Sequence, residues 1–136
     1  MAGDRESARA AVEGHLSDPH AGGLASLAHV FVAALTGDQP KLRQLVTAEF
    51  EELMWNDLQY AHMMAQSYSL LGANDQALHW LERAVARGFI HHRFLGDLDS
   101  LLAPLRGDGR FRGIMDRARK ASEAFPGEPM RASPLR

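Results

Sequence analysis

The sequence predicts an all-α fold made of antiparallel helix hairpins and closed by a C-terminal helix. Apolar residues recur at intervals of three and four over most of the chain, which is the period of an amphipathic helix. Glycines follow several of these runs, as they commonly do at helix C-termini. No segment alternates apolar and polar residues with the period of two that a half-buried strand requires.

Length and composition indicate one globular domain. The 136 residues are 46% hydrophobic and 24% charged, with a formal net charge of −2, so the total charge attracts neither nucleic acid nor an anionic membrane. The chain has no cysteine, which excludes disulfides, cysteine-ligated metals and a thiol nucleophile. Charged residues within the first twenty positions and the lack of a long apolar run argue against a signal peptide and a membrane span. A cytoplasmic location is the resulting expectation.

We expect three regions along the chain. Residues 1–23 hold a short helix at 5–16 and a linker, residues 24–124 form the helical domain, and residues 125–136, with three prolines, form a disordered tail. Within the domain, helices are expected over 24–36, 38–55, 57–71, 74–87 and 108–124.

The expected N-caps of the last four helices are polar residues that precede the apolar runs. They are Asp38, Asn56, Asn74 and Asp108.

Residues 89–107 are too apolar for a free loop, but Pro104 disfavours one long helix there.

Two central hairpins share one plan of helix, glycine turn and helix. Their turn glycines, Gly37 and Gly72, lie 72 − 37 = 35 residues apart. Around the second turn, the small Ala65 and Ala77 would let the two helix axes approach closely. The positions expected to pack this hairpin are Ala65, Tyr68, Gly72, Ala77, Leu81 and Ala84.

This hairpin, residues 58–91, resembles the tetratricopeptide repeat (TPR), a helix pair of about 34 residues with a fixed set of packing positions. Residues 77–89 and 104–111 are similar to the last repeat and closing helix of many bacterial TPR proteins. The resemblance covers residues 58–120, and residues 24–55 look like a degenerate earlier repeat with Val30, Ala33 and Leu42 at the packing positions. Ala61 stands where the family has a large residue, and Gly109 replaces a proline before the closing helix.

The resemblance implies a non-catalytic adaptor or regulatory module that binds a partner protein or peptide and needs no cofactor or metal. In that family, the first helix of each hairpin lines the binding groove. His62, Gln66 and Ser69 share one helix face at i, i+4 and i+7, and we expect them to be solvent-exposed. The groove residues expected on this basis are Gln59, His62, Gln66, Ser69 and Leu70.

Two other functions remain open at this stage. Arg106, Arg110, Arg112, Arg117, Arg119 and Lys120 cluster around the last helix, which permits a DNA-associated or regulatory domain. A helical bundle that binds a small molecule or a metal is the other alternative, although no two of the seven histidines are spaced i, i+4. No catalytic motif is present, so we expect no enzyme. A homo-oligomer is compatible with the sequence.

Overall fold

The computed structural model describes residues 6–7, 10 and 22–124. Every regular element in these ranges is helical, which confirms the predicted all-α class. Most of the expected N-terminal helix and linker, and the expected tail, lie outside the described residues. Within the described part of the chain, no helix is long and apolar enough to cross a membrane.

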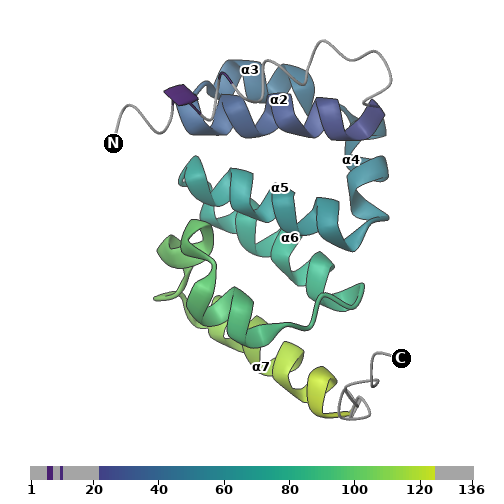
Figure 1. Cartoon of the computed structure of the whole chain (residues 1–136), viewed down its shortest axis with the longest axis vertical. Helices are drawn as coiled ribbons and strands as arrows, with labels where there is room; N and C mark the ends of the chain where they lie inside the picture. The colour runs from purple at the N-terminus through teal and green to yellow at the C-terminus, as the bar shows by residue number, and fades with distance from the viewer. Residues whose placement is uncertain (1–5, 8–9, 11–21, 125–136) are drawn as a thin grey trace, which may run out of the picture.

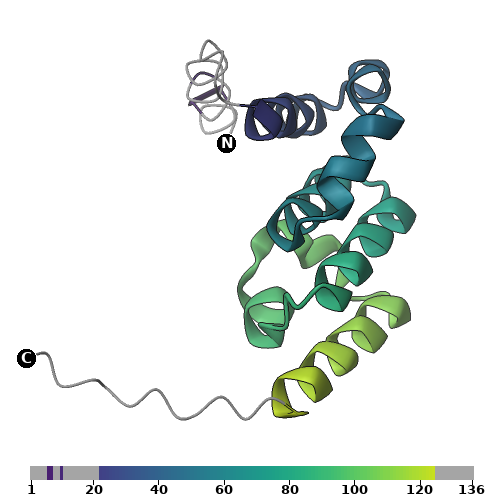
Figure 2. The same ribbon diagram turned by 90° about the vertical axis from the view of Figure 1, so that its right-hand side faces the viewer.

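The helices form a layered array in which consecutive units lie next to one another. Figure 1 shows α2 above α5, with the segment of residues 94–105 on the opposite side of α5 and α7 at the far end. Figure 2 shows the same order from the side. The elements are α2 (Gly22–Thr36), α3 (Gln39–Leu45), α4 (Ala48–Trp55), α5 (Leu58–Leu70), α6 (Asn74–Ala86), the π-helical turn η1 (Phe94–Leu98), the 3-10 segment η2 (Ser100–Leu105) and α7 (Gly109–Ala124).

Glycine turns divide the array into units. Gly37 and Gly72 have φ angles of +70° and +79°, the left-handed geometry in which glycine ends helices without strain. Gly107 follows a further 107 − 72 = 35 residues along, between η2 and α7, but it does not have a positive φ angle. The segment 94–105 packs on α5, and α7 packs on α6. We refer to the segment 94–105 and α7 together as the third unit.

The expected helix over 38–55 is wrong, because the chain breaks within it. Asp38 caps α3 as predicted, accepting a hydrogen bond from the Lys41 backbone N–H at 3.0 Å. After Val46, Thr47 adopts an extended backbone and its hydroxyl accepts from the Phe50 N–H at 3.2 Å. The threonine side chain offers the backbone a new N-cap, so α4 starts separately.

Two predicted caps are also wrong. Asp57, rather than Asn56, caps α5 by accepting from the backbone N–H groups of Gln59 and Tyr60. Asn56 instead donates to the Glu52 carbonyl at 2.8 Å and closes α4. At α6, Asn74 is the first helical residue, and Ala73 occupies the cap position without a side-chain hydrogen bond. Asp108 does bond the first turn of α7, accepting from the Arg110 N–H at 2.8 Å.

The core runs through all three units. Along the α5–α6 interface the small residues Ala61, Ala65, Ala77 and Ala84 are fully buried, which lets the two backbones approach closely. Leu95, Leu102 and Leu105 of the third unit are equally inaccessible, so the segment 94–105 contributes side chains to the core. The first hairpin, α2 and α3, buries Val30, Ala33 and Leu42 as well.

Candidate functional site

The residues expected to line a groove on α5 divide into two sets. Gln59 is exposed, and Gln66 and Leu70 are half-buried. His62 and Ser69 are only 8% and 2% exposed, so the expectation that they face solvent is wrong. The reason is that the segment 94–105 covers this side of α5.

Asp99 is the centre of the contact between α5 and this segment. Its Oδ2 atom accepts hydrogen bonds from His62 Nε2 at 2.7 Å and from Gln66 Nε2 at 2.9 Å. Its Oδ1 atom accepts from the Leu101 backbone N–H at 3.1 Å, which also caps η2. Asp99 itself is 5% exposed, and a buried carboxylate must be paired or hydrogen-bonded in this way.

Backbone carbonyls of the segment complete the attachment. The Ser69 hydroxyl of α5 donates to the Leu101 carbonyl at 2.7 Å. Within the segment itself, Arg106 Nη2 donates to the Asp99 carbonyl at 3.0 Å. His62, Gln66 and Ser69 do share one face of α5, as the sequence predicts, but that face binds the chain's own next unit. Their polarity is thus explained by internal hydrogen bonds.

Aromatic contacts surround the imidazole of His62. Its ring stacks on Phe89 with centroids 4.6 Å apart and meets Phe94 edge-on at 6.0 Å. Burial alone would raise the pKa of Asp99, but the hydrogen bonds from His62 and Gln66, with the His62 charge, outweigh it and lower that pKa. The arrangement holds an ionised carboxylate in place and fastens two units together.

Exposed apolar side chains on η1 lie beside this network, and a further one lies at the start of α2. Phe94 and Leu98 on η1 are 41% and 72% exposed, and Leu24 at the start of α2 is 53% exposed. The positions 24, 59 and 94 are spaced by 35 residues, as are 28, 63 and 98; in a repeat array of that period such positions would face the same side. We call Leu24, Gln59, Met63, Leu70, Phe94 and Leu98 the apolar strip.

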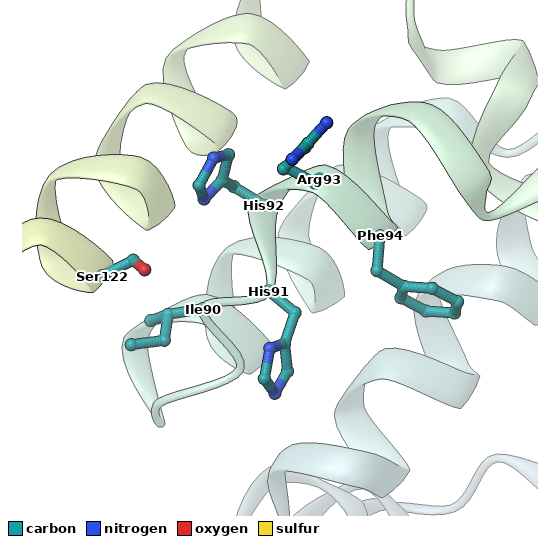
Figure 3. A pocket seen from close by; sticks show the side chains of 6 residues that line it. All are labelled: Ile90, His91, His92, Arg93, Phe94 and Ser122. Carbon is teal, nitrogen blue, oxygen red and sulfur yellow. The ribbon is translucent and has the colours of Figure 1, made fainter. Parts of the chain in front are cut away.

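A hollow of about 300 Å³ lies between the 90–93 turn and the end of α7. In Figure 3, His92 and Ser122 point into the space between the turn and α7, whereas His91 and Phe94 point to the other side of the turn. The two imidazoles therefore diverge and do not form a shared ligand site. Within the described ranges, no group of three or more His, Asp or Glu side chains is placed to hold a metal ion.

Four basic residues of the last helix, Arg110, Arg117, Arg119 and Lys120, are engaged in ion pairs. Arg117 pairs with Glu82 of α6 at 2.7 Å, and Arg119 and Lys120 both pair with Asp116. Hydrogen bonds from Lys120 and Arg119 lower the pKa of Asp116. Arg110 likewise bonds Asp75 and Asp108. The positive charge of α7 is thus largely compensated within the chain.

Sequence reasoning missed the residue at the centre of the site, Asp99. The available signal was a lone acid between the apolar positions Leu98 and Leu101–Leu102, in a segment already recognised as too apolar for a loop. A polar face on α5 and an acid in the next unit, read together, indicate such a contact. No protein-family model, curated protein or solved structure matches this chain.

Proposed function

We propose that this chain is a non-catalytic protein-interaction module of the TPR type, which binds a segment of a partner protein along the apolar strip. The groove predicted from the sequence is retained in part: Gln59 and Leu70 belong to the strip, and the accessible part of Gln66 borders it. His62 and Ser69 act behind it, by fixing the segment that displays Phe94 and Leu98.

The packing of the second hairpin supports the TPR assignment. Ala65, Ala77 and Ala84 are fully buried, and Tyr68 and Leu81 fill the space beside them. Gly72 makes the left-handed turn between the helices. A repeated helix pair that stacks on its neighbours produces an extended binding surface rather than a catalytic cavity.

The observation that argues most strongly for protein binding is the exposed pair Phe94 and Leu98. Apolar side chains of this size, held on an ordered backbone, are typical anchors of protein interfaces. Their backbone is ordered because Leu95 and Leu102 are buried on either side and Asp99 is bonded to α5. The strip contains no charged side chain, so the partner segment should present an apolar, uncharged face.

The test is co-purification from the native host with tagged wild-type protein and two variants. Leu98→Glu places a charge in the strip at the most exposed apolar position. Ala103→Glu places the same charge at an exposed position of the same segment outside the strip. Mass spectrometry should identify a protein retained by the wild type and by Ala103→Glu but lost with Leu98→Glu.

Calorimetric titration with the purified partner then distinguishes direct binding from co-purification through a third protein. We expect Leu98→Glu to weaken the affinity by at least about tenfold, which corresponds to roughly 1.4 kcal/mol. Equal affinity for both variants would place the binding surface elsewhere. Circular dichroism should show the same helix content for all three proteins, since exposed substitutions leave the fold intact.

A further inference from the structure

Helix α2 is apolar on the side that faces away from the described core. Its fully buried residues form one face, with Leu27, Val30, Ala33 and Ala34 between 0% and 3% exposed. At 100° per residue, six further apolar residues occupy an arc of about 120° on the opposite side. They are Leu24, Ala25, Ala28, Phe31, Val32 and Leu35.

Leu24 of this arc belongs to the apolar strip, and Ala28 shares the register of the strip residues Met63 and Leu98. The edge of the arc beyond Leu24 forms a stripe that begins at Ala28. Ala25, Ala28 and Val32 are spaced i, i+3 and i+7, which aligns them along one helix face. All three are half-buried. Val32 also lines an open hollow of about 550 Å³ with His29, Thr36 and Lys41. A helix that is apolar on two sides packs on two sides, so this stripe needs a second neighbour.

The second hairpin indicates what kind of neighbour belongs there. Ser67 of α5, at 32 + 35 = 67, is fully buried, and Tyr60, at 25 + 35 = 60, is half-buried. Both lie on the side of α5 opposite His62 and Ser69, which contact the segment 94–105. Since α2 packs on α5 from that opposite direction (Figure 1), the equivalent stripe on α2 is the position of a preceding helix.

The chain itself supplies a segment of suitable chemistry just before α2. Residues 5–16 have Ala8, Ala11, Val12, His15 and Leu16 on one predicted face. Glu6, Ser7 and Ala10, which the structure does describe, are helical and exposed and lie on the other face of that predicted helix. The five residues 17–21 are within the usual length of a connection between antiparallel helices.

We propose that residues 5–16 form a helix that packs antiparallel to α2 over Ala25, Ala28 and Val32, and so cap the N-terminal end of the array. Alanines on both sides, such as Ala8 and Ala28, permit close approach of the two backbones. The C-terminal end already has such a cover in α7, whose outer side is charged. Terminal units of a repeat array require a polar outer face for solubility, and Glu6 and Ser7 would provide it.

Disulfide trapping in the full chain tests this arrangement, because the protein contains no cysteine of its own. With the 17–21 connection centred on residue 19, position 8 of an antiparallel helix lies at the level of residue 30, and Val32 is the stripe residue within one helical turn of that level. The variant Ala8→Cys/Val32→Cys should form a disulfide within the monomer under mild oxidation. The matched control Ala10→Cys/Val32→Cys, with its first cysteine on the polar face, should remain reduced over the same time.

Two outcomes would overturn the proposal. Equal oxidation of both pairs would mean that residues 5–16 have no fixed face toward α2. A disulfide that joins two chains on a non-reducing gel would assign the stripe to a second copy of the protein.

Hydrogen exchange gives a second readout that does not depend on trapping. Val12→Glu should accelerate amide exchange in residues 22–36, whereas Ser7→Glu, which adds the same charge on the polar face, should not. Unchanged exchange in both variants would equally exclude a packed N-terminal helix. Neither experiment depends on the proposed partner-binding strip.

Discussion

The hairpins α2–α3 and α5–α6 have the same turn but different second helices. Leu42 of the first hairpin stands where the second has Ala77, and the exposed Glu49 stands where the second has the buried Ala84. Helix α6 continues for 13 residues, whereas α3 ends after 7. The glycine turn therefore sets the spacing of the units, and small buried residues on the second helix keep it packed along its whole length.

The largest expected difference between the two hairpins is the loss of stability when a core side chain of the second helix is truncated. Leu81 of α6 is fully buried, and Leu81→Ala should lower the free energy of unfolding by about 2–5 kcal/mol through the cavity it leaves. Its counterpart 35 residues earlier is Val46, which is half-buried at the end of α3. Val46→Ala should cost less than about 1.5 kcal/mol. Urea denaturation of both variants checks the difference, and equal losses would contradict the comparison.

Enlarging the small residues of the second hairpin should have the next largest effect. Ala65 and Ala77 are fully buried, so Ala65→Leu or Ala77→Leu should cost about 1–3 kcal/mol by overpacking. The exposed Ala103 provides the control, since Ala103→Leu should stay within about 0.5 kcal/mol of wild type. If both core variants melted like the wild type, the helices would not approach closely at these alanines.

The contact between α5 and the third unit should be sensitive to pH. Because the pKa of Asp99 is lowered in the folded protein, its ionisation stabilises the fold at pH values above the unfolded pKa, about 3.9. This contribution is lost as the pH falls through the lowered folded pKa. Asp99→Asn should lower stability at pH 7 by on the order of 1 kcal/mol.

The pH profile distinguishes this charge effect from a simple packing defect. The difference between wild type and Asp99→Asn should shrink as the pH falls below about 3.9, when measured by chemical denaturation across a pH series. Ser100→Asn, at the exposed neighbouring position, should leave the wild-type profile unchanged. A difference that persists at low pH would show that the carboxylate charge does not contribute.

The helices and their glycine stops could be predicted from sequence because each depends on local pattern. The break at Thr47 could not, because a β-branched residue within an apolar run is compatible with either a continued helix or a new cap. The polar face of α5 was correctly grouped but wrongly placed in solvent. Its partners, Asp99 and Leu101, lie more than 30 residues away in an irregular segment, where no α-helical periodicity of the sequence indicates their position.

The smallest effect compares the caps of the two second helices. Asp38 and Ala73 are equivalent positions, since 38 + 35 = 73. Their backbones agree closely, with φ and ψ of −81° and 79° at Asp38 and −85° and 73° at Ala73. Only Asp38 accepts a hydrogen bond from the third residue beyond it, the Lys41 N–H. The cap geometry therefore exists in both hairpins, but the side chain is missing in the second.

Ala73→Asp should supply that side chain and raise the free energy of unfolding by about 0.5–1 kcal/mol. The carboxylate would also interact favourably with the N-terminal end of the α6 dipole, although Asp75 in the same turn reduces this gain by like-charge repulsion. Asp38→Ala should cost a similar amount in the first hairpin. Thermal melts of the two single variants and the double variant measure the gain expected from Ala73→Asp and the loss expected from Asp38→Ala. The two changes in stability should add in the double variant, because the two caps lie in different units. The half-buried methyl group of Ala73 packs against the core. A loss of stability in Ala73→Asp would mean that this packing stabilises the fold more than the added cap hydrogen bond does.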